Sequence, residues 1–326
     1  MKLIIQIPCH NEAATLPVVL AEIPRRVDGF DAVEILVIDD GSVDGTSEVA
    51  SRLGVDHIVR LNRRRGLATA FRMGLEAALS RGADVVVNTD GDNQYRGTDI
   101  PKLTAPILRG EADLVVGARP IDNIEHFSPL KKRLQRLGTW VVRRISHTEI
   151  QDAASGFRAM SREAALRLNV FSSYTYTLET IIQAGLSNMR VLSVPVGTNP
   201  PLRESRLIRS IPSYLKRSIL TMIRVFVLYK PLRFFVWLGG IVFAMGSLLG
   251  LRFVYYWMIG QGTGKVQSLI LAAVLLLMGF QLAIAGLLSD LIATNRRILE
   301  ELQVEARRNR LLADRPPWHR SQTRSR

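Results

Sequence analysis

The chain has 326 residues, enough for one large domain and an appendage, and its single cysteine excludes an internal disulfide framework. Five histidines without metal-ligand spacing argue against a zinc site. The net charge of +14 is uneven, because residues 1–202 hold 24 basic and 23 acidic residues whereas residues 203–326 hold 19 and 6. The basic part also contains the only long apolar runs, so we expect it to meet a membrane surface and not nucleic acid.

Short β-branched runs alternate with helical stretches through the first 120 residues. Strands are predicted at 3–7, 33–38, 58–61, 85–89 and 114–118, with helices up to about residue 26, over 46–53 and after residue 66. Several strands end in acidic loops, which indicates an α/β sheet that binds a ligand at its carboxyl edge. No G-x-G-x-x-G or P-loop motif is present, so a dinucleotide Rossmann site or a P-loop site is not predicted.

The loop after the fourth predicted strand is the strongest site candidate. Asp90 and Asp92 flank a glycine, so both carboxylates can turn toward one point, with the side-chain carbonyl of Gln94 within reach. Mg²⁺ takes one or two carboxylates and completes its shell with phosphate oxygens and water. The alternative interpretation is a solvated turn, and the sequence context has to decide between the two.

That context is a series of motifs that resembles a known family. Segments 8–12, 39–46, 66–70 and 90–94 look like the successive motifs of inverting family 2 glycosyltransferases with the GT-A fold. Segments 152–158 and 203–207 narrow the resemblance to polyprenyl-phosphate glycosyltransferases, the group that includes dolichyl-phosphate mannose synthase. The resemblance runs in order over roughly residues 3–230 and implies an α/β, GT-A nucleotide-sugar-binding sheet with helices on both faces.

The resemblance also implies roles for individual residues. Nucleotide-binding residues would be Pro8, Glu12, Asp39 and Asp90. A divalent cation, Mg²⁺ or Mn²⁺, would be held by Asp90, Asp92 and Gln94. Asp152 and Arg158 would be catalytic, and the acceptor phosphate would meet Arg119, Arg203 and Arg206. Since a lipid monophosphate is largely a dianion at neutral pH, we expect Asp152 to orient substrate, with general-base work as a secondary role. The alternative for Asp152 is a turn cap.

The C-terminal part reads as a membrane region. Residues 203–232 predict basic amphipathic helices lying in the membrane interface, although a buried amphipathic helix would share their apolar pattern. Residues 233–292 predict a transmembrane hairpin of two helices, about 233–259 and 266–290. Basic residues flank the outer ends of this hairpin, whereas the link between its helices holds only Lys265. The predicted catalytic domain, 1–202, and both termini therefore face the cytosol at the cell membrane. Residues 293–326 predict a charged helix and a disordered basic tail.

Three functions compete at this stage. The first is inverting transfer of a sugar from a nucleotide sugar of the GDP-mannose or UDP-glucose type to a dolichyl or undecaprenyl monophosphate. The second is a processive polysaccharide synthase or a transferase to a lipid hydroxyl; relatives of that kind usually show a Gln-x-x-Arg-Trp motif, which this chain lacks. The third is a non-catalytic membrane scaffold, which the acidic motifs argue against. The expected partners are nucleotide sugar, polyprenyl phosphate and the membrane, with no nucleic acid, and homo-oligomerisation stays open.

Overall fold

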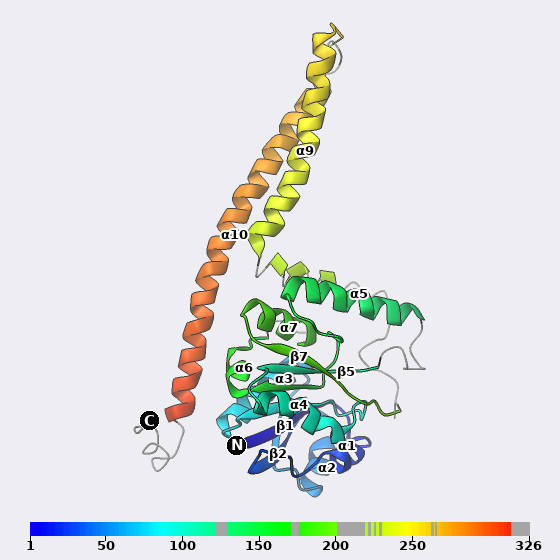
Figure 1. Cartoon of the computed structure of the whole chain (residues 1–326), viewed down its shortest axis with the longest axis vertical. Coiled ribbons are helices and arrows are strands. Elements are labelled where there is room, and N and C mark those ends of the chain that lie inside the picture. Colours follow the sequence, from blue (N-terminus) through cyan, green and yellow to red (C-terminus); the bar gives the residue numbers. More distant parts are fainter. Residues whose placement is uncertain are drawn as a thin grey trace. The chain divides into compact units, whose positions relative to one another are not determined.

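The computed structural model describes residues 1–120, 129–170, 176–200, 219–220, 223–224, 226–227, 230–261, 264 and 266–313. The chain divides into two compact units, Met1–Met222 with Gln303–Arg326, and Ile223–Leu302. The first unit contains a sheet with its covering helices, and the second contains most of two long helices (Figure 1).

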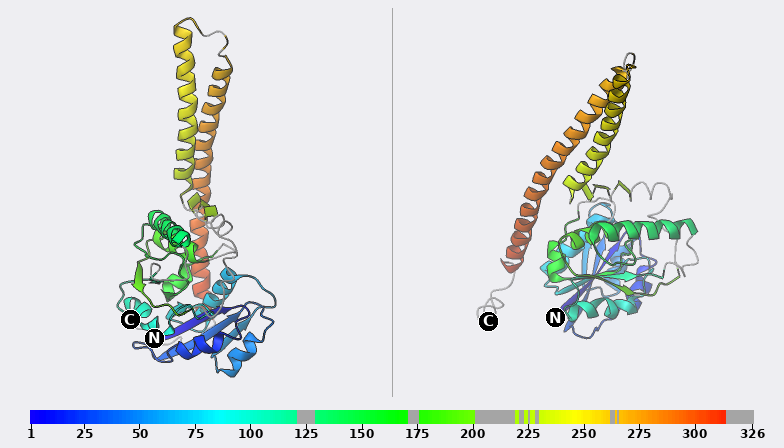
Figure 2. Two further views of the ribbon diagram at one scale, coloured as in Figure 1. Left: turned by 90° about the vertical axis from the view of Figure 1, so that its right-hand side faces the viewer. Right: turned by 45° about the horizontal axis from the view of Figure 1, so that its top comes forward.

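Seven strands form one mixed sheet in the order β3-β2-β1-β4-β6-β5-β7. Figure 2 shows the sheet and its helices in two further views. They are β1 (Lys2–Cys9), β2 (Ala32–Asp39), β3 (His57–Arg60), β4 (Val85–Asn88), β5 (Leu114–Ala118), β6 (Arg158–Ser161) and β7 (Val191–Pro195). All neighbouring strands are parallel except β6, which runs antiparallel to both β4 and β5. The five predicted strands are confirmed, whereas β6 and β7 were not predicted.

Helices cover both faces of this sheet. They are α1 (Leu16–Glu22), α2 (Thr46–Arg52), α3 (Leu67–Ser80), the short 3₁₀ helix η1 (Gly97–Asp99), α4 (Ile100–Leu108), α5 (Pro129–Ser146), α6 (Arg162–Arg167) and α7 (Thr177–Leu186). The first helix is shorter than predicted. At its start, Ala13 N donates to Asp44 Oδ2 at 3.0 Å, in the loop after β2. At its end, Ile23 is extended, as expected of a residue that precedes a proline.

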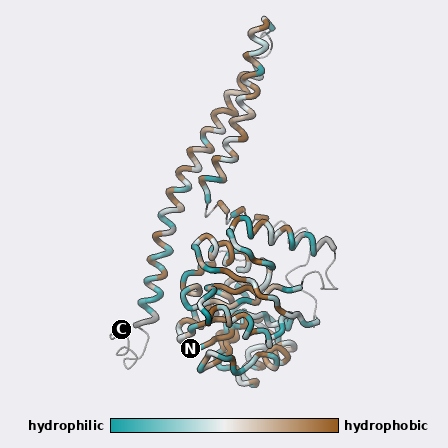
Figure 3. Tube along the Cα trace, in the orientation of Figure 1, coloured by the Kyte–Doolittle hydropathy of each residue, from teal (hydrophilic) through white to brown (hydrophobic). Residues whose placement is uncertain are grey.

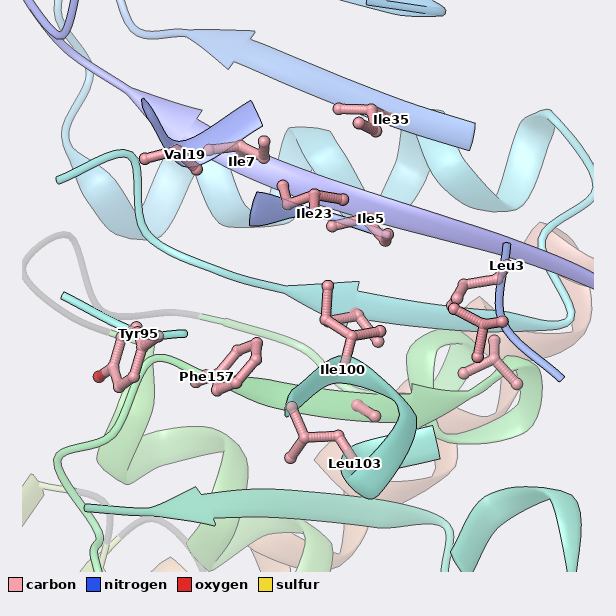
Figure 4. Packing of buried hydrophobic residues seen from close by; sticks show 14 of the residues in the cluster. Leu3, Ile5, Ile7, Val19, Ile23, Ile35, Tyr95, Ile100, Leu103 and Phe157 are labelled. Atoms are coloured by element: carbon pink, nitrogen blue, oxygen red, sulfur yellow. The ribbon is translucent and has the colours of Figure 1, made fainter. Parts of the chain in front are cut away.

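Alternate residues of the central strands reach opposite faces, as a period of two requires. Leu3, Ile5 and Ile7 of β1 belong to the main core with residues of α1 and α4. Figure 4 shows Ile100 and Leu103 in this packing. On the other face, Gly74 of α3 lies so close to β1 and β2 that an added Cβ would stand 2.5 Å from Gln6 Oε1 and 2.8 Å from Ile38 Cδ1. The glycine thus sets how closely α3 approaches the sheet.

The second unit contains the two long apolar helices. Helix α9 covers Pro231–Met258, and α10 covers Val266–Ala313 and continues from this unit into the first. Both are long and apolar enough to cross a membrane, and only 11% and 17% of their most apolar windows are buried in the protein. Figure 3 shows apolar colouring over α9 and the first part of α10, with more hydrophilic colouring toward the end of α10. These helices fit the predicted hairpin, since Gly239 and Gly279 let their backbones meet: a Cβ on Gly239 would lie 2.8 Å from Gly279 O.

One prediction about the C-terminal part is corrected, and two others are not tested. The charged helix predicted near the end of the chain is not separate, because α10 runs through it without interruption, and no glycine or proline stands between Asp290 and Ala313 to end the helix. Most of the predicted interfacial segment 203–232 and the predicted tail beyond residue 313 lie outside the described residues.

We predict that Gly74→Val lowers the free energy of unfolding by about 1–3 kcal/mol, because the new side chain would force α3 away from Gln6 and Ile38. The measurement is thermal and chemical unfolding in detergent. Arg72→Val is the control, because Arg72 is exposed on the same helix and receives the same side chain without a close neighbour. Valine is a better helix former than glycine and a poorer one than arginine, so helix propensity alone would stabilise Gly74→Val and destabilise only Arg72→Val. A Gly74→Val protein at least as stable as the wild type would show that the close approach at Gly74 contributes nothing.

Candidate active site

The carboxyl edge of the sheet collects the predicted site residues. Strands β1, β2, β4 and β5 all run in the same direction within the sheet. The residues that follow these strands therefore lie at one edge of the sheet. Asp39 ends β2, Asp90 and Asp92 follow β4, and Arg119 follows β5. Strand β6 runs the other way and therefore begins at this edge, where Arg158 is paired with Asn88 of β4. Segments distant in sequence are thus brought together by strand direction.

The Asp90–Gln94 loop is fastened to the segment after β1. The Thr15 hydroxyl lies 2.7 Å from Gly91 O and 2.8 Å from the Glu12 carboxylate, and its single proton is shared between these two acceptors. A Cβ on Gly91 would stand 2.9 Å from Cys9 Sγ, so only glycine fits there without displacement. These contacts fix the backbone between the two aspartates.

A buried network of hydrogen bonds supports the Asp90–Gln94 loop. Asn88 accepts from Gln6 Nε2 and donates to Gly156 O and Tyr176 Oη, each at 2.8 Å. Gly156 N in turn donates to Tyr95 Oη at 2.9 Å. Burial raises the pKa of Tyr95 to about 12 and that of Tyr176 well above its ordinary value, so both hydroxyls stay protonated at neutral pH.

Gly156 also fixes the distance between this network and Asp90. A Cβ at Gly156 would lie 2.9 Å from each carboxylate oxygen of Asp90 and 2.9 Å from Tyr176 Oη. The carboxylate of Asp90 therefore rests against the backbone of Gly156, which ties the acidic loop to the segment that precedes β6.

Arg119 and Asp152 form a buried, two-pronged ion pair. Arg119 Nε donates to Asp152 Oδ2 at 2.6 Å and its NH2 donates to Oδ1 at 3.1 Å. The two side chains are 6% and 1% exposed. Arg119 NH1 lies 3.5 Å from Gln94 Oε1, so the carbonyl predicted to face a cation faces this guanidinium. Sequence analysis selected Arg119 and Asp152 separately, and the structure brings them together.

Arg158 is held inside the protein. Its NH1 donates to Thr177 O at 3.1 Å and also to the hydroxyl of Thr180, and its NH2 donates to Ser155 O. The residue is fully buried, and burial lowers the pKa of its guanidinium. The contacts tie β6 to α7, so this arrangement favours a positioning role over direct contact with a ligand.

The residues predicted for the nucleotide pocket lie on β1, β2 and their loops. Pro8, paired with Ile38 across the sheet, and Glu12 are buried. Asp39 accepts from Ser42 N at 2.7 Å and from the Ser47 hydroxyl, so its carboxylate shapes the loop after β2. These three residues lie at the same edge as the Asp90–Gln94 loop.

The electrostatics of Asp90 suit a bound cation. Burial and the neighbouring Asp92 carboxylate together raise the pKa of Asp90 to about 7, against the opposite effect of Arg119 and Arg158. Two mutually repelling carboxylates are stabilised by a divalent cation between them. No group of three or more His, Cys, Asp or Glu side chains gathers as a metal site among the described residues. Asp90 and Asp92 therefore fit a cation that takes its other ligands from phosphate oxygens and water.

Sequence analysis missed the residues that support the site. Asn88, Tyr95 and Tyr176 carry the network under Asp90, and Thr15 fastens its loop. Tyr95 directly follows the acidic run and was the one detectable candidate. Tyr176 lies far along the chain, and its partners could not be inferred from spacing.

The mixed sheet, with an acidic loop at its carboxyl edge, is that of a GT-A fold, and comparison with known proteins agrees. A structure of glucosyl-3-phosphoglycerate synthase from Mycobacterium tuberculosis, solved with Mn²⁺, uridine diphosphate and phosphoglyceric acid, is similar with a TM-score of 0.56. The alignment has 23% identity and covers 69% of this chain and 78% of that one. This similarity supports the fold alone.

Sequence comparison identifies the family. Residues 4–168 match the model of glycosyl transferase family 2, and the chain belongs to that family. Glycosyltransferase AglJ of Haloferax volcanii is 29% identical over 306 residues, covering 89% of this chain and 93% of that protein. An undecaprenyl-phosphate mannosyltransferase of Micrococcus luteus is 27% identical over 206 residues, covering 60% and 83%. The protein is thus a glycosyltransferase, which removes the scaffold hypothesis.

We predict that the stabilising effect of Asp90→Asn grows as pH rises from 5 to 8 in chelator. A carboxyl whose pKa is raised to about 7 in the folded state binds its proton more tightly there than in the unfolded chain. Wild-type stability therefore falls between the ordinary Asp pKa and pH 7, and Asn, a neutral mimic, does not follow this fall. Melting temperatures of both proteins across pH test it, with exposed Asp28→Asn as control. A pH-independent difference would contradict the raised pKa.

A second prediction concerns the Arg119–Asp152 pair. Arg119→Gln and Asp152→Asn should each cost on the order of 3 kcal/mol, because each leaves a buried charge without its partner. The double variant should lose at least ~1 kcal/mol less than the sum. Unfolding of all four proteins gives the coupling energy. The exposed pair Arg25–Asp56 is the control cycle, expected below about 1 kcal/mol. Equal coupling in the two cycles would refute a special role for burial.

Proposed function

We propose that this glycosyltransferase transfers a sugar from a nucleotide-diphosphate sugar, of the GDP-mannose or UDP-glucose type, to a dolichyl or undecaprenyl monophosphate with inversion. One observation carries the proposal: the Asp90–Asp92 loop and the Arg119–Asp152 pair share one edge of the sheet, in a chain that also has two helices apolar enough to cross a membrane. The name of the Micrococcus luteus relative supports a lipid phosphate as the acceptor.

The donor side of the site rests on the acidic loop. Asp90 and Asp92 would hold Mg²⁺ or Mn²⁺, and the bound cation would offset the negative charge of the departing diphosphate. Pro8, Glu12 and Asp39 would line the nucleoside pocket. Thr15 and Gly156 fix the acidic loop, so its carboxylates need little rearrangement when the donor binds. The Mn²⁺ and uridine diphosphate in the M. tuberculosis structure support a cation of this kind.

The proposed acceptor site depends on the buried Arg119–Asp152 pair. Both oxygens of Asp152 are bonded to Arg119, and Oδ1 also accepts from Ala154 N at 3.1 Å, so Asp152 is poorly placed to remove a proton. Because the lipid phosphate is already largely a dianion, little proton removal is needed. We therefore assign Asp152 to holding Arg119 in position and Arg119 to receiving the phosphate. Arg203 and Arg206, also predicted for the phosphate, lie outside the described residues.

The proposed location is the cytosolic face of the cell membrane. Helix α9 and the first part of α10 would cross as a hairpin, since both are long and apolar enough, and large side chains such as Trp237 and Leu248 of α9 are more than half exposed. Basic residues flank the outer ends of the pair, which favours placing those ends in the cytosol.

Asp92→Asn should abolish transfer while the protein remains folded and membrane-bound, because it removes an anionic cation ligand from a loop and no core contact. Purified wild type and variant would be incubated with Mn²⁺, a panel of radiolabelled nucleotide sugars and undecaprenyl phosphate, and the anionic, mild-acid-labile glycolipid counted. Asp28→Asn is the control. Wild-type turnover by Asp92→Asn at saturating Mn²⁺ would remove the cation assignment, and failure to make any such lipid with the whole panel would remove the proposed reaction.

A further inference from the structure

Helix α5 has two opposite faces with different chemistry. Thr139, Val142 and Ser146 recur at helical spacing and are buried. They lie on the side that meets α7, where a Cβ on Gly185 would stand 2.1 Å from Ser146 O. Arg133, Leu137, Trp140 and Arg144 recur at spacings of four, three and four residues and share the opposite side.

The outer face combines bulky apolar and basic side chains. Leu137 is 55% exposed and Trp140 is 62% exposed, although both are large enough to belong in a core. Arg133, Arg143 and Arg144 are exposed beside them. The helix contains six basic residues and no acidic one. A face of this kind is neither an ordinary solvated surface, which would not need an exposed tryptophan, nor a core face.

The charge and the composition of the outer face of α5 indicate what covers it. A tryptophan and a leucine between arginines match the boundary of a bilayer, where the ring lies at headgroup level and the guanidinium groups meet anionic phosphates. Nucleic acid would meet the arginines but leave Leu137 without a partner. A second copy of the chain would bring another set of arginines against this one. We therefore propose that the outer face of α5 lies on the surface of an anionic membrane.

This face is connected to the site. The hydroxyl of Thr139, on the inner side of α5, accepts a hydrogen bond from Ala153 N at 3.2 Å. Ala153 follows Asp152, whose carboxylate holds Arg119. A bilayer that fixes α5 would therefore also fix the segment carrying Asp152. The inference rests on the proposed membrane-associated function, and its test does not use sugar transfer, so the two can fail separately.

The test uses the buried single cysteine. Because Cys9 is only 2% exposed, a nitroxide label can be attached at Trp140→Cys in the full-length protein, with unmutated protein as the check for labelling at Cys9. The labelled protein is reconstituted in phosphatidylglycerol-containing vesicles, and collisions with oxygen and with a water-soluble nickel chelate are compared. Val18→Cys is the matched control, because Val18 is an exposed apolar residue on helix α1 and has no arginine on that helix.

We expect the label at 140 to be shielded from the nickel chelate and open to oxygen, and the label at 18 to show the reverse. Neutralising Arg143 and Arg144 together to Gln should lower the ratio of bound to unbound α5 by roughly 30-fold, which appears as restored nickel access. Phosphatidylcholine vesicles should act in the same direction. Equal nickel access at positions 140 and 18 would overturn the proposal. So would spin–spin broadening at 140 that disappears on dilution with unlabelled protein, because it would assign the face to a second copy.

Discussion

The need to compensate buried charge governs the architecture of the site. Asp39, Asp152, Arg119 and Arg158 are all nearly inaccessible to water, and an isolated ion in such a place would cost several kcal/mol. This cost is offset by local partners. Arg119 is paired with Asp152, and Arg158 is surrounded by carbonyl and hydroxyl oxygens. Asp39 accepts hydrogen bonds from a backbone amide and from serine. Asp90, at the same edge of the sheet, lacks such a full set of partners, so burial and Asp92 raise its pKa and a cation suits it.

Under the proposed function, helix α5 links two parts of the problem that an enzyme acting on a lipid phosphate has to solve. Its inner side reaches the Asp152 segment through Thr139, and its outer side presents Trp140 to the surroundings. A soluble donor can approach from water, but a polyprenyl phosphate can leave the bilayer only by a short distance. A helix that lies on the lipid surface and also contacts the segment carrying Asp152 would hold the two reactants at the same distance from the membrane.

The sequence predicted those parts of the fold in which local pattern and tertiary role agree. Strands β1, β2 and β4 are apolar runs that lead into polar, acidic loops, and the resemblance to family 2 enzymes selected Asp90, Asp92 and Asp152. Strand β6 was not predicted because its sequence, Arg-Ala-Met-Ser, begins with a buried arginine. Strand β7 was not predicted because it is only half buried. The pairing of Arg119 with Asp152, 33 residues apart, depends on the reversed strand β6 and has no local signal.

The reversal of β6 has a consequence for how such enzymes can diversify. Strand β5 ends at Ala118 and β6 starts at Arg158, and the two strands are hydrogen-bonded neighbours, with Val116 opposite Arg158. The chain between these two strands therefore leaves and rejoins the sheet at neighbouring positions on the same edge. Between Arg119 and Asp152 its length and sequence can change while the half built from β1, β2 and β4, which would bind the donor, keeps its register. A new acceptor could thus be acquired by replacing one segment of a transferase whose nucleotide chemistry stays intact.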